Sequence, residues 1–200
     1  MFRFSFYISI MISLMNLSCI QKENSNHSIE TETNIHHDSL NPVIITQNKV
    51  QIKGGTYTPL YGSDSQRVTV SDFQIDVYPV TNAEYLVFVK ANPQWQKSKV
   101  KKIFADANYL RNWKNDTTLG DNMLDNSPIT NVSWFAANAY CKATDSRLPT
   151  LDEWEYVAMA DSKDIDARRK ANYNQYILDW YEKQNTYLHE IGKTYQNYWG

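Results

Sequence analysis

A helix-start signature near the middle of the chain constrains its fold more than any other feature. Thr150 is followed three positions later by Glu153, which is the spacing of a capping box. In this motif the threonine hydroxyl accepts from the glutamate amide, and the glutamate carboxylate accepts from the threonine amide. A helix is therefore predicted to begin at Thr150. Apolar residues then recur at helical spacing, at Leu151, Trp154 and Ala158, and predict a buried face built around the tryptophan.

Two further helix starts are visible upstream. Residues 131–141 read N-V-S-W-F-A-A-N-A-Y-C, in which Ser133 is suited to cap a short helix. Thr81 and Glu84 form a second capping box and predict a helix over residues 82–91. The chain therefore contains at least three short helices whose first residues are fixed by local chemistry.

Together these segments resemble the signature of the formylglycine-generating enzyme family, also called the sulfatase-modifying factor domain. The family carries an N-V-S-W-x-x-A-x-x-Y-C helix followed by R-L-P-T-x-x-E-W-E-Y, to which residues 131–141 and 147–156 correspond. Residues 77–85 are similar to the family's E-V-T-N-x-x-Y segment. The resemblance implies an α+β fold of the sulfatase-modifying-factor type: irregular, mixed, rich in loop and related to the C-type lectin fold.

Three regions are predicted along the chain: a signal peptide at residues 1–18, a lipidated flexible tether at 19–46 and an incomplete, N-terminal part of the family domain at 47–200. Arg3 precedes an apolar run too short for the roughly 20 residues that span a bilayer. Ser18-Cys19 then resembles a bacterial lipobox, which makes Cys19 the predicted lipid-attachment site. Asn16 stands where lipoboxes favour leucine, so an ordinary cleaved signal with an incidental Cys19 is the alternative.

The predicted tether is polar and contains three histidines. Residues 20–42 are mostly Asn, Ser, Glu, Thr and His, a composition that buries too little apolar surface to order itself. His27, His36 and His37 are interpreted as solvated side chains, because a flexible linker gives no fixed ligand geometry.

Short strands and a long loop are predicted around these helices. Val50 and Ile52 alternate ahead of a glycine pair, and residues 67–78 alternate again, with a bulge predicted at residues 71–72. Residues 92–128 are predicted to be an irregular insertion, and its aromatic stretch at 109–113 is interpreted as internal packing rather than a contact patch. A last helix is predicted over 171–181.

The resemblance implies an oxidase that converts a sulfatase cysteine to Cα-formylglycine with copper(I) held by two thiolates. Its cysteine pair and its calcium-binding G-N-V-W-E-W motif lie in a C-terminal third, downstream of a segment that residues 195–200 resemble. The chain is therefore expected to be truncated, with Trp180, Tyr181, Tyr198 and Trp199 left partly uncovered. Copper and calcium are implied only if that third exists, and no catalytic, cofactor-binding or metal residues are predicted here.

Cys141 is the only other cysteine in the sequence. Its register on the helix predicts a buried small hydrophobe, and acylation of Cys19 would exclude an intramolecular disulfide. Arg147, Glu153, Trp154 and Glu155 are interpreted as cap, core and surface pairs.

These observations predict an envelope lipoprotein, membrane-anchored and facing the periplasm or the cell surface. Its domain is expected to be non-catalytic and to bind an unidentified envelope protein or peptide. A net charge of −2 and the lack of a basic stripe argue against a nucleic-acid partner. The alternative is the copper-dependent oxidase, if the natural protein continues past residue 200.

Overall fold

The computed structural model describes residues 17–21, 40–43, 45, 48–60, 66–182, 189–194 and 196–200, without the side chains of 180–182. In chain order its elements are β1 (Ile20–Gln21), β2 (Lys49–Ile52), β3 (Gly55–Tyr57), β4 (Val68–Val70), β5 (Phe73–Asp76), α2 (Asn82–Ala91), the 3₁₀ turn η1 (Pro93–Trp95), α3 (Trp134–Ala143), β6 (Ser146–Arg147), α4 (Leu151–Ala158) and α5 (Ala171–Glu182). Short strands, short helices and long connections confirm the predicted α+β class. No helix within the described ranges is long and apolar enough to cross a membrane.

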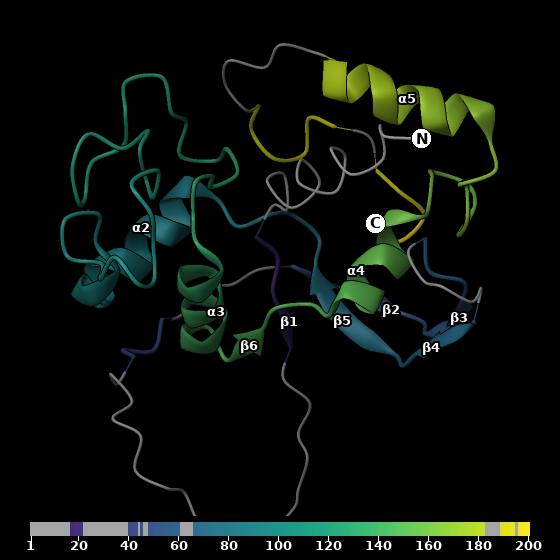
Figure 1. Cartoon of the computed structure of the whole chain (residues 1–200), viewed down its shortest axis with the longest axis horizontal. Helices are drawn as coiled ribbons and strands as arrows, with labels where there is room; N and C mark the ends of the chain where they lie inside the picture. Colours follow the sequence, from purple (N-terminus) through teal and green to yellow (C-terminus); the bar gives the residue numbers. More distant parts are fainter. Residues whose placement is uncertain are drawn as a thin grey trace, which may run out of the picture.

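An antiparallel four-stranded sheet runs through the middle of the molecule in the order β2-β5-β1-β6 (Figure 1). Its central strand β1 is only two residues long, and Ile20 lies opposite Ile75 on one side and Arg147 on the other. Among the described strands, β6 pairs with β1 alone, so β1 joins the α3–α4 region to the rest of the sheet. Strands β3 and β4 form a separate hairpin beside α4.

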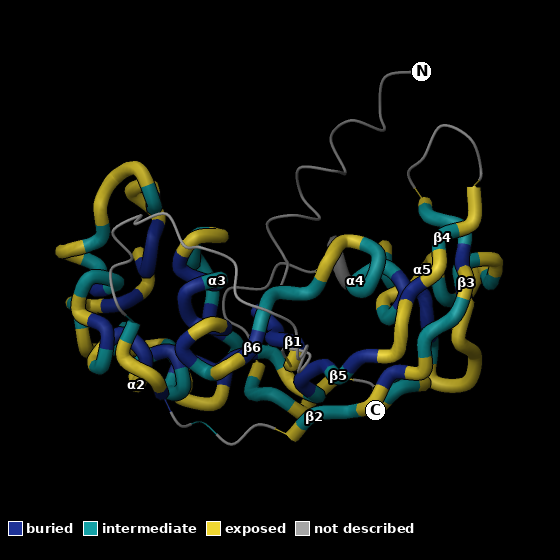
Figure 2. Tube along the Cα trace, turned by 90° about the horizontal axis from the view of Figure 1, so that it is seen from below, coloured by how far each residue is buried: buried dark blue, intermediate teal, exposed yellow. Residues whose placement is uncertain are grey.

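Two apolar clusters form the core, and dark blue buried stretches are visible on both sides of the molecule in Figure 2. One cluster packs α2 and α3 under the long segment 96–133, with Tyr85, Phe88 and Tyr140 fully buried at its centre. The other lies between the sheet, the β3–β4 hairpin and α4. Tyr109 and Trp113 are buried in the first cluster, which agrees with their interpretation as internal packing.

All three predicted helix starts are confirmed. Thr150 accepts from the Glu153 amide at 3.2 Å and its own amide donates to the Glu153 carboxylate at 2.7 Å. Thr81 and Glu84 make the same reciprocal pair at the start of α2. Ser133 caps α3 by accepting from the amide at position 136. The last predicted helix is also present, as α5.

The predicted buried face of α4 is wrong. Leu151 is 71% exposed, Ala158 is exposed and Trp154 is half-buried, whereas Tyr156 and Met159 are buried in the second cluster. The helix has two apolar stripes at helical spacing. The β3–β4 hairpin packs on the stripe that contains Tyr156. The spacing of apolar residues within the helix does not predict which of the two stripes a distant hairpin will cover.

The predicted bulge at residues 71–72 is instead a passage between two sheets. Val70 ends the hairpin, and Phe73 begins β5 in the four-stranded sheet. Val68 and Val70 before this passage and Phe73 and Ile75 after it still reach one apolar cluster, although their alternation changes phase at residues 71–72. Asp72 holds this corner by accepting from the Gly54 amide at 2.8 Å. A Cβ on Gly54 would lie 2.2 Å from the Val70 carbonyl oxygen, so only glycine fits there.

A few residues at the ends of the predicted leader and tether pack inside the fold. Leu17 and Ile20 are buried, and the Leu17 carbonyl accepts from the Val80 amide at 2.7 Å. Val43 is also buried, and its amide donates to the Ala143 carbonyl at 2.8 Å. These few apolar side chains fill space inside the fold, although residues 20–42 are polar on average. Residues 1–16 and 22–39, with His27, His36 and His37, lie outside the described residues.

Of the aromatic residues expected to be uncovered, Tyr198 is 49% exposed. Trp199 is half-buried and packs against Tyr156, with ring centroids 5.8 Å apart. The side chains of Trp180 and Tyr181 are outside the described part.

Candidate functional site

The two cysteines of the chain meet where β1 passes α3. Cys19 and Cys141 form a disulfide with a Cα–Cα separation of 5.5 Å, and they are 1% and 0% exposed. The prediction that Cys141 is buried is confirmed. An acylated Cys19 is expected to exclude an intramolecular disulfide, and in this structure the two cysteines are paired with one another instead. A sulfur atom in a disulfide cannot also hold a thioether, so lipid attachment at Cys19 stays a prediction for a different state of the chain.

A buried ion pair lies directly beside the disulfide. The Cys19 amide donates to Asp76 Oδ2 at 2.9 Å, and Lys49 Nζ pairs with Asp76 Oδ1. Burial raises the pKa of the Asp76 carboxyl more than the ammonium group of Lys49 and the Cys19 amide lower it. The pair joins β1, β2 and β5 at one point. Sequence reasoning missed it, because Asp76 is one polar position within the alternating run of residues 67–78.

The motif residues Arg147 and Glu153 hold β6 against α4. Arg147 donates to both Glu153 carboxylate oxygens, at 2.8 and 2.7 Å. Burial alone would raise the pKa of the Glu153 carboxyl, but the bonds from Arg147 and Thr150 outweigh it and hold the pKa below its ordinary range. This geometry matches the interpretation of the two residues as cap and pair, since every charged atom of Glu153 is used within the scaffold.

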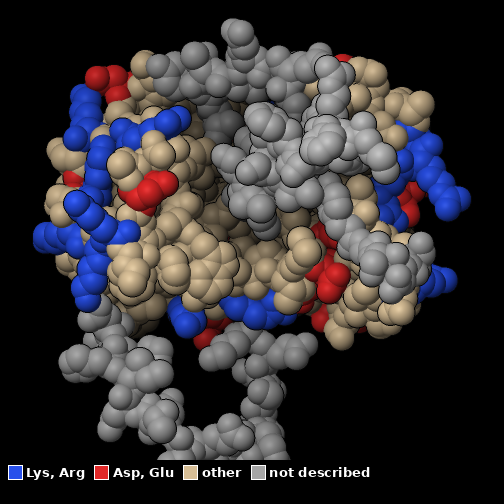
Figure 3. Space-filling model, in the orientation of Figure 1, with Lys and Arg blue, Asp and Glu red and all other residues tan. Residues whose placement is uncertain are grey.

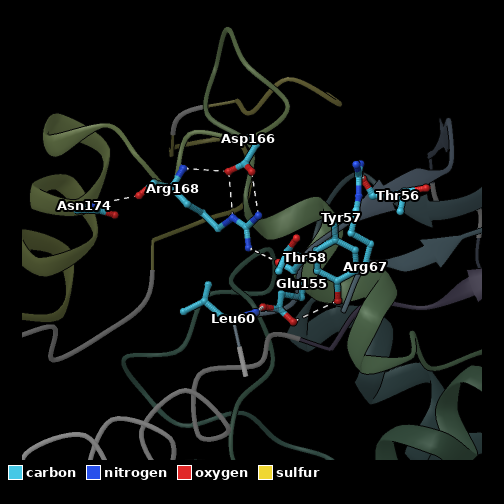
Figure 4. A network of polar contacts seen from close by, with 9 residues as sticks. All are labelled: Thr56, Tyr57, Thr58, Leu60, Arg67, Glu155, Asp166, Arg168 and Asn174. Atoms are coloured by element: carbon cyan, nitrogen blue, oxygen red, sulfur yellow. Dashed lines mark hydrogen bonds and ion pairs between the residues drawn. The ribbon is translucent and has the colours of Figure 1, made fainter. Parts of the chain in front are cut away.

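A second polar network surrounds the Glu155 carboxylate of α4 (Figure 4). The Tyr57 hydroxyl lies 2.8 Å from Asp152 Oδ1 and 3.2 Å from Glu155 Oε2, and the Leu60 amide donates to Glu155. Burial, reinforced by the hydrogen bond to Asp152 and the charge of Glu155, raises the pKa of the Tyr57 hydroxyl far above its ordinary value. Tyr57 is therefore a neutral donor at every physiological pH.

Arg168 extends this network to the start of α5 (Figure 4). Its guanidinium donates to the Thr58 carbonyl at 2.8 Å and to both oxygens of Asp166 at 2.9 and 2.8 Å. The bond from Arg168 is the main reason that the pKa of the Asp166 carboxyl is lowered. Asn174 donates to the Arg168 carbonyl at 3.1 Å. The network fixes the end of the β3–β4 hairpin against α4 and α5, which is a loop-positioning role.

Within the described part of the chain, the residues do not form the copper site that the family resemblance implies. A copper(I) site needs two thiolates. The only two cysteines of the sequence are joined to one another and buried. Within the described ranges no three His, Cys, Asp or Glu side chains gather in a way that would hold a calcium ion or any other metal.

Comparison with known proteins agrees with the resemblance. Residues 38–200 match the family described as "Sulfatase-modifying factor enzyme 1-like domain". The chain is similar to the bovine "Inactive C-alpha-formylglycine-generating enzyme 2", with 30% identity over 154 residues, covering 59% of this chain and 50% of the relative. It is also 30% identical over 132 residues to the mouse "Formylglycine-generating enzyme", covering 51% of this chain and 36% of that protein. An uncharacterized Bacillus subtilis protein is 29% identical over 120 residues, covering 59% of this chain and 24% of its own length.

The chain thus spans about half of the first of these relatives and less of the others. The family match covers most of the sequence, and both helix motifs have the capped geometry that their residues predict. The chain belongs to the formylglycine-generating enzyme family, with a sulfatase-modifying-factor-type domain over residues 38–200.

Proposed function

We propose that this protein is exported to the bacterial cell envelope and that its domain is a non-catalytic binding or assembly module for an envelope protein or peptide. The observation that carries this proposal is the pairing of Cys19 with Cys141. Formylglycine formation at a two-thiolate copper site requires two reactive thiols. This sequence has two cysteines, and their disulfide leaves no free thiol in it. A similar bovine protein is named inactive, which supports the non-catalytic role.

The envelope location is supported by the disulfide and by the leader-like N-terminus. Disulfides persist in oxidising compartments, such as the bacterial periplasm and the cell surface, and are rare in the cytosol. The first residues of the sequence have the cation and apolar run of an export signal.

A lipid anchor on Cys19 is the second part of the proposal, and it competes with the disulfide. Acyl transfer to an exported cysteine precedes folding, so an acylated Cys19 would leave Cys141 as a buried free thiol. Intact-mass measurement of the membrane and soluble fractions separates the two states. A diacylglycerol mass on a chain beginning at Cys19 supports the anchor. A Cys19–Cys141 disulfide in all of the recovered protein overturns the anchor and leaves the export proposal standing.

The non-catalytic role is tested with a Cys-x-Pro-x-Arg peptide, copper(I) and oxygen. The full chain is expected to leave the peptide thiol unchanged in mass spectrometry, and the Cys141→Ala variant serves as the matched control. A thiol-to-aldehyde mass change that disappears in Cys141→Ala would overturn the proposal.

The alternative is a copper-dependent oxidase, and the similarity to the mouse formylglycine-generating enzyme favours it. The matched region covers only about a third of that protein. Both proposals are therefore compatible with the part of the domain that this sequence contains. Reading the gene beyond codon 200 distinguishes them. A downstream cysteine pair favours the oxidase, and a continuation without one favours the binding module.

A further inference from the structure

Positive charge is concentrated in one short stretch of this acidic chain. Residues 90–114 hold seven cations and a single carboxylate, Asp106, which gives +6 on a chain whose net charge is −2 and leaves −8 for the rest. The cations are Lys90, Lys97, Lys99, Lys101, Lys102, Arg111 and Lys114. In Figure 3 blue side chains gather along the outer edge of the lobe that carries α2 and the 96–133 segment. Sequence reasoning missed this concentration, because intervening polar and aromatic residues dilute it.

Three of these lysines are exposed and form no ion pair with a described carboxylate. Lys114 pairs with Asp121, and Lys97 donates to two backbone carbonyls. By contrast, Lys99, Lys101 and Lys102 are exposed, and no described carboxylate lies within ion-pair distance of them. The ammonium groups of Lys101 and Lys102 are therefore available to an external anion, and that of Lys99 is available too but lies near the Asp116 carboxylate, which is held by Ser98.

Large apolar side chains are exposed beside these lysines. Ile103, in the turn that follows Lys102, is 76% exposed. Trp134 and Phe135, in the first turn of α3, are 64% and 45% exposed. Ring contacts join the two places, since the Phe104 centroid lies 5.3 Å from that of Phe135, which lies 5.4 Å from that of Trp134. We call this the basic–aromatic surface: Lys99, Lys101, Lys102, Ile103, Trp134 and Phe135.

We propose that the basic–aromatic surface binds the face of an anionic phospholipid bilayer, with the lysines at the phosphates and Ile103 and Trp134 in the interfacial layer. Lysine clusters are attracted to anionic lipid, and tryptophan favours the headgroup region. An exposed isoleucine at the tip of a lysine-flanked turn gains by entering that layer. An acidic peptide would pair with the lysines but would leave Ile103 and Trp134 exposed to water. A lipid surface accommodates both the charges and the apolar side chains, so we favour lipid. This contact goes beyond the proposed function and does not require a lipid on Cys19.

The test uses the full chain made in a cell-free system, so that no lipid is attached, and oxidised to form its disulfide. Sedimentation is measured with vesicles of 30% phosphatidylglycerol in phosphatidylcholine and with pure phosphatidylcholine. We expect binding to the anionic vesicles that falls steeply at high salt. Each lysine near an anionic surface contributes about fivefold in affinity, so changing Lys99, Lys101 and Lys102 together to Gln should weaken binding roughly a hundredfold. Ile103→Ser should weaken it roughly tenfold.

A charge-matched control separates this surface from net charge and from the apolar leader, which every variant shares. Lys53, Lys163 and Arg169 are exposed, lie in the other part of the molecule and lose the same charge when all three become Gln. This control should bind within about twofold of the original chain. Hydrogen exchange should show protection over residues 99–104 and the first turn of α3 only with anionic vesicles. Urea midpoints check that each variant folds. If the triple lysine variant does not fold, the Ile103→Ser variant tests the surface on its own.

Any one of the following results would overturn the proposal. The first is an equal loss of binding in the control triple. The second is binding to neutral vesicles that no variant alters, or protection confined to other residues. The third is lysine-dependent binding of soluble polyglutamate without vesicle binding, which would assign the surface to an acidic protein instead.

Discussion

Gly55 faces the Tyr156 hydroxyl across the junction between the β3–β4 hairpin and α4, which makes this packing testable with a two-residue cycle. A Cβ added at Gly55 would lie 2.6 Å from Tyr156 Oη, but 3.5 Å from the ring carbon Cζ. The tyrosine ring lies against Tyr57 and Trp199, with centroids 5.8 Å away in each case. The ring therefore has little freedom to move aside.

The expected free energies follow from this geometry. Gly55 does not have a positive φ, so alanine fits its backbone and by itself stabilises by about 0.5 kcal/mol. The clash with the hydroxyl costs roughly 2 kcal/mol, as overpacking does, so Gly55→Ala should destabilise by about 1.5 kcal/mol. Tyr156→Phe loses the 3.3 Å bond to the Lys53 carbonyl and should cost about 1 kcal/mol. In the double variant the clash is gone, so it should be more stable than either single variant, with a coupling of about 2 kcal/mol.

Urea unfolding followed by circular dichroism measures the four free energies. The matched control is Tyr57→Phe, which removes a neighbouring hydroxyl that does not face Gly55, and it should combine additively with Gly55→Ala. Additivity of Gly55→Ala and Tyr156→Phe within about 0.5 kcal/mol would refute the packing of the hairpin on this face of α4.

Three further outcomes are expected. Replacing Cys19 or Cys141 with Ala in the oxidised chain should lower the free energy of unfolding by about 5 kcal/mol, from the entropy of a loop with sequence separation 122; a urea midpoint unchanged by the substitution or by reductant would contradict it. Because the pKa of Glu153 is lowered in the folded state, its stabilisation is present above the ordinary value of 4.5 and is lost as pH falls through the folded pKa; Arg147→Gln should flatten that acid limb in urea titrations, and an unchanged limb would argue against the pair. Half-buried Trp154, changed to Ala, should cost roughly 1–2 kcal/mol in the same assay, less than the roughly 3–5 kcal/mol of a buried aromatic.

The parts of this fold that the sequence predicted are those set by chemistry within a few residues. The capping boxes at Thr81 and Thr150 work through hydrogen bonds spanning three positions, so their geometry follows from the sequence alone. Ser133 caps α3 for the same reason. The family signature made of these segments therefore identified the α+β domain correctly.

The parts that failed depend on contacts between distant segments. Two distant contacts decide that α4 buries Tyr156 and not Trp154. The Tyr156 hydroxyl bonds to the Lys53 carbonyl about 100 residues earlier, and its ring packs against Trp199. The Cys19–Cys141 pair spans 122 residues, and the ring contacts from Phe104 through Phe135 to Trp134 join a loop to a helix. Periodicity finds apolar stripes but does not say which one is covered.

The two fates of Cys19 also have different consequences for the sheet. In this structure Cys19 is 1% exposed and its amide is bonded to Asp76, so the site has no room for a diacylglycerol on the sulfur. An acylated Cys19 must leave this position. Strand β1 would then leave the gap between β5 and β6, and β6 would lose its only partner strand. Lipid attachment and a docked β1 are therefore mutually exclusive. The Asp76 amide, which donates to the Cys19 carbonyl at 3.3 Å, and the Arg147 amide, opposite Ile20, should exchange faster in an acylated protein than in the disulfide form.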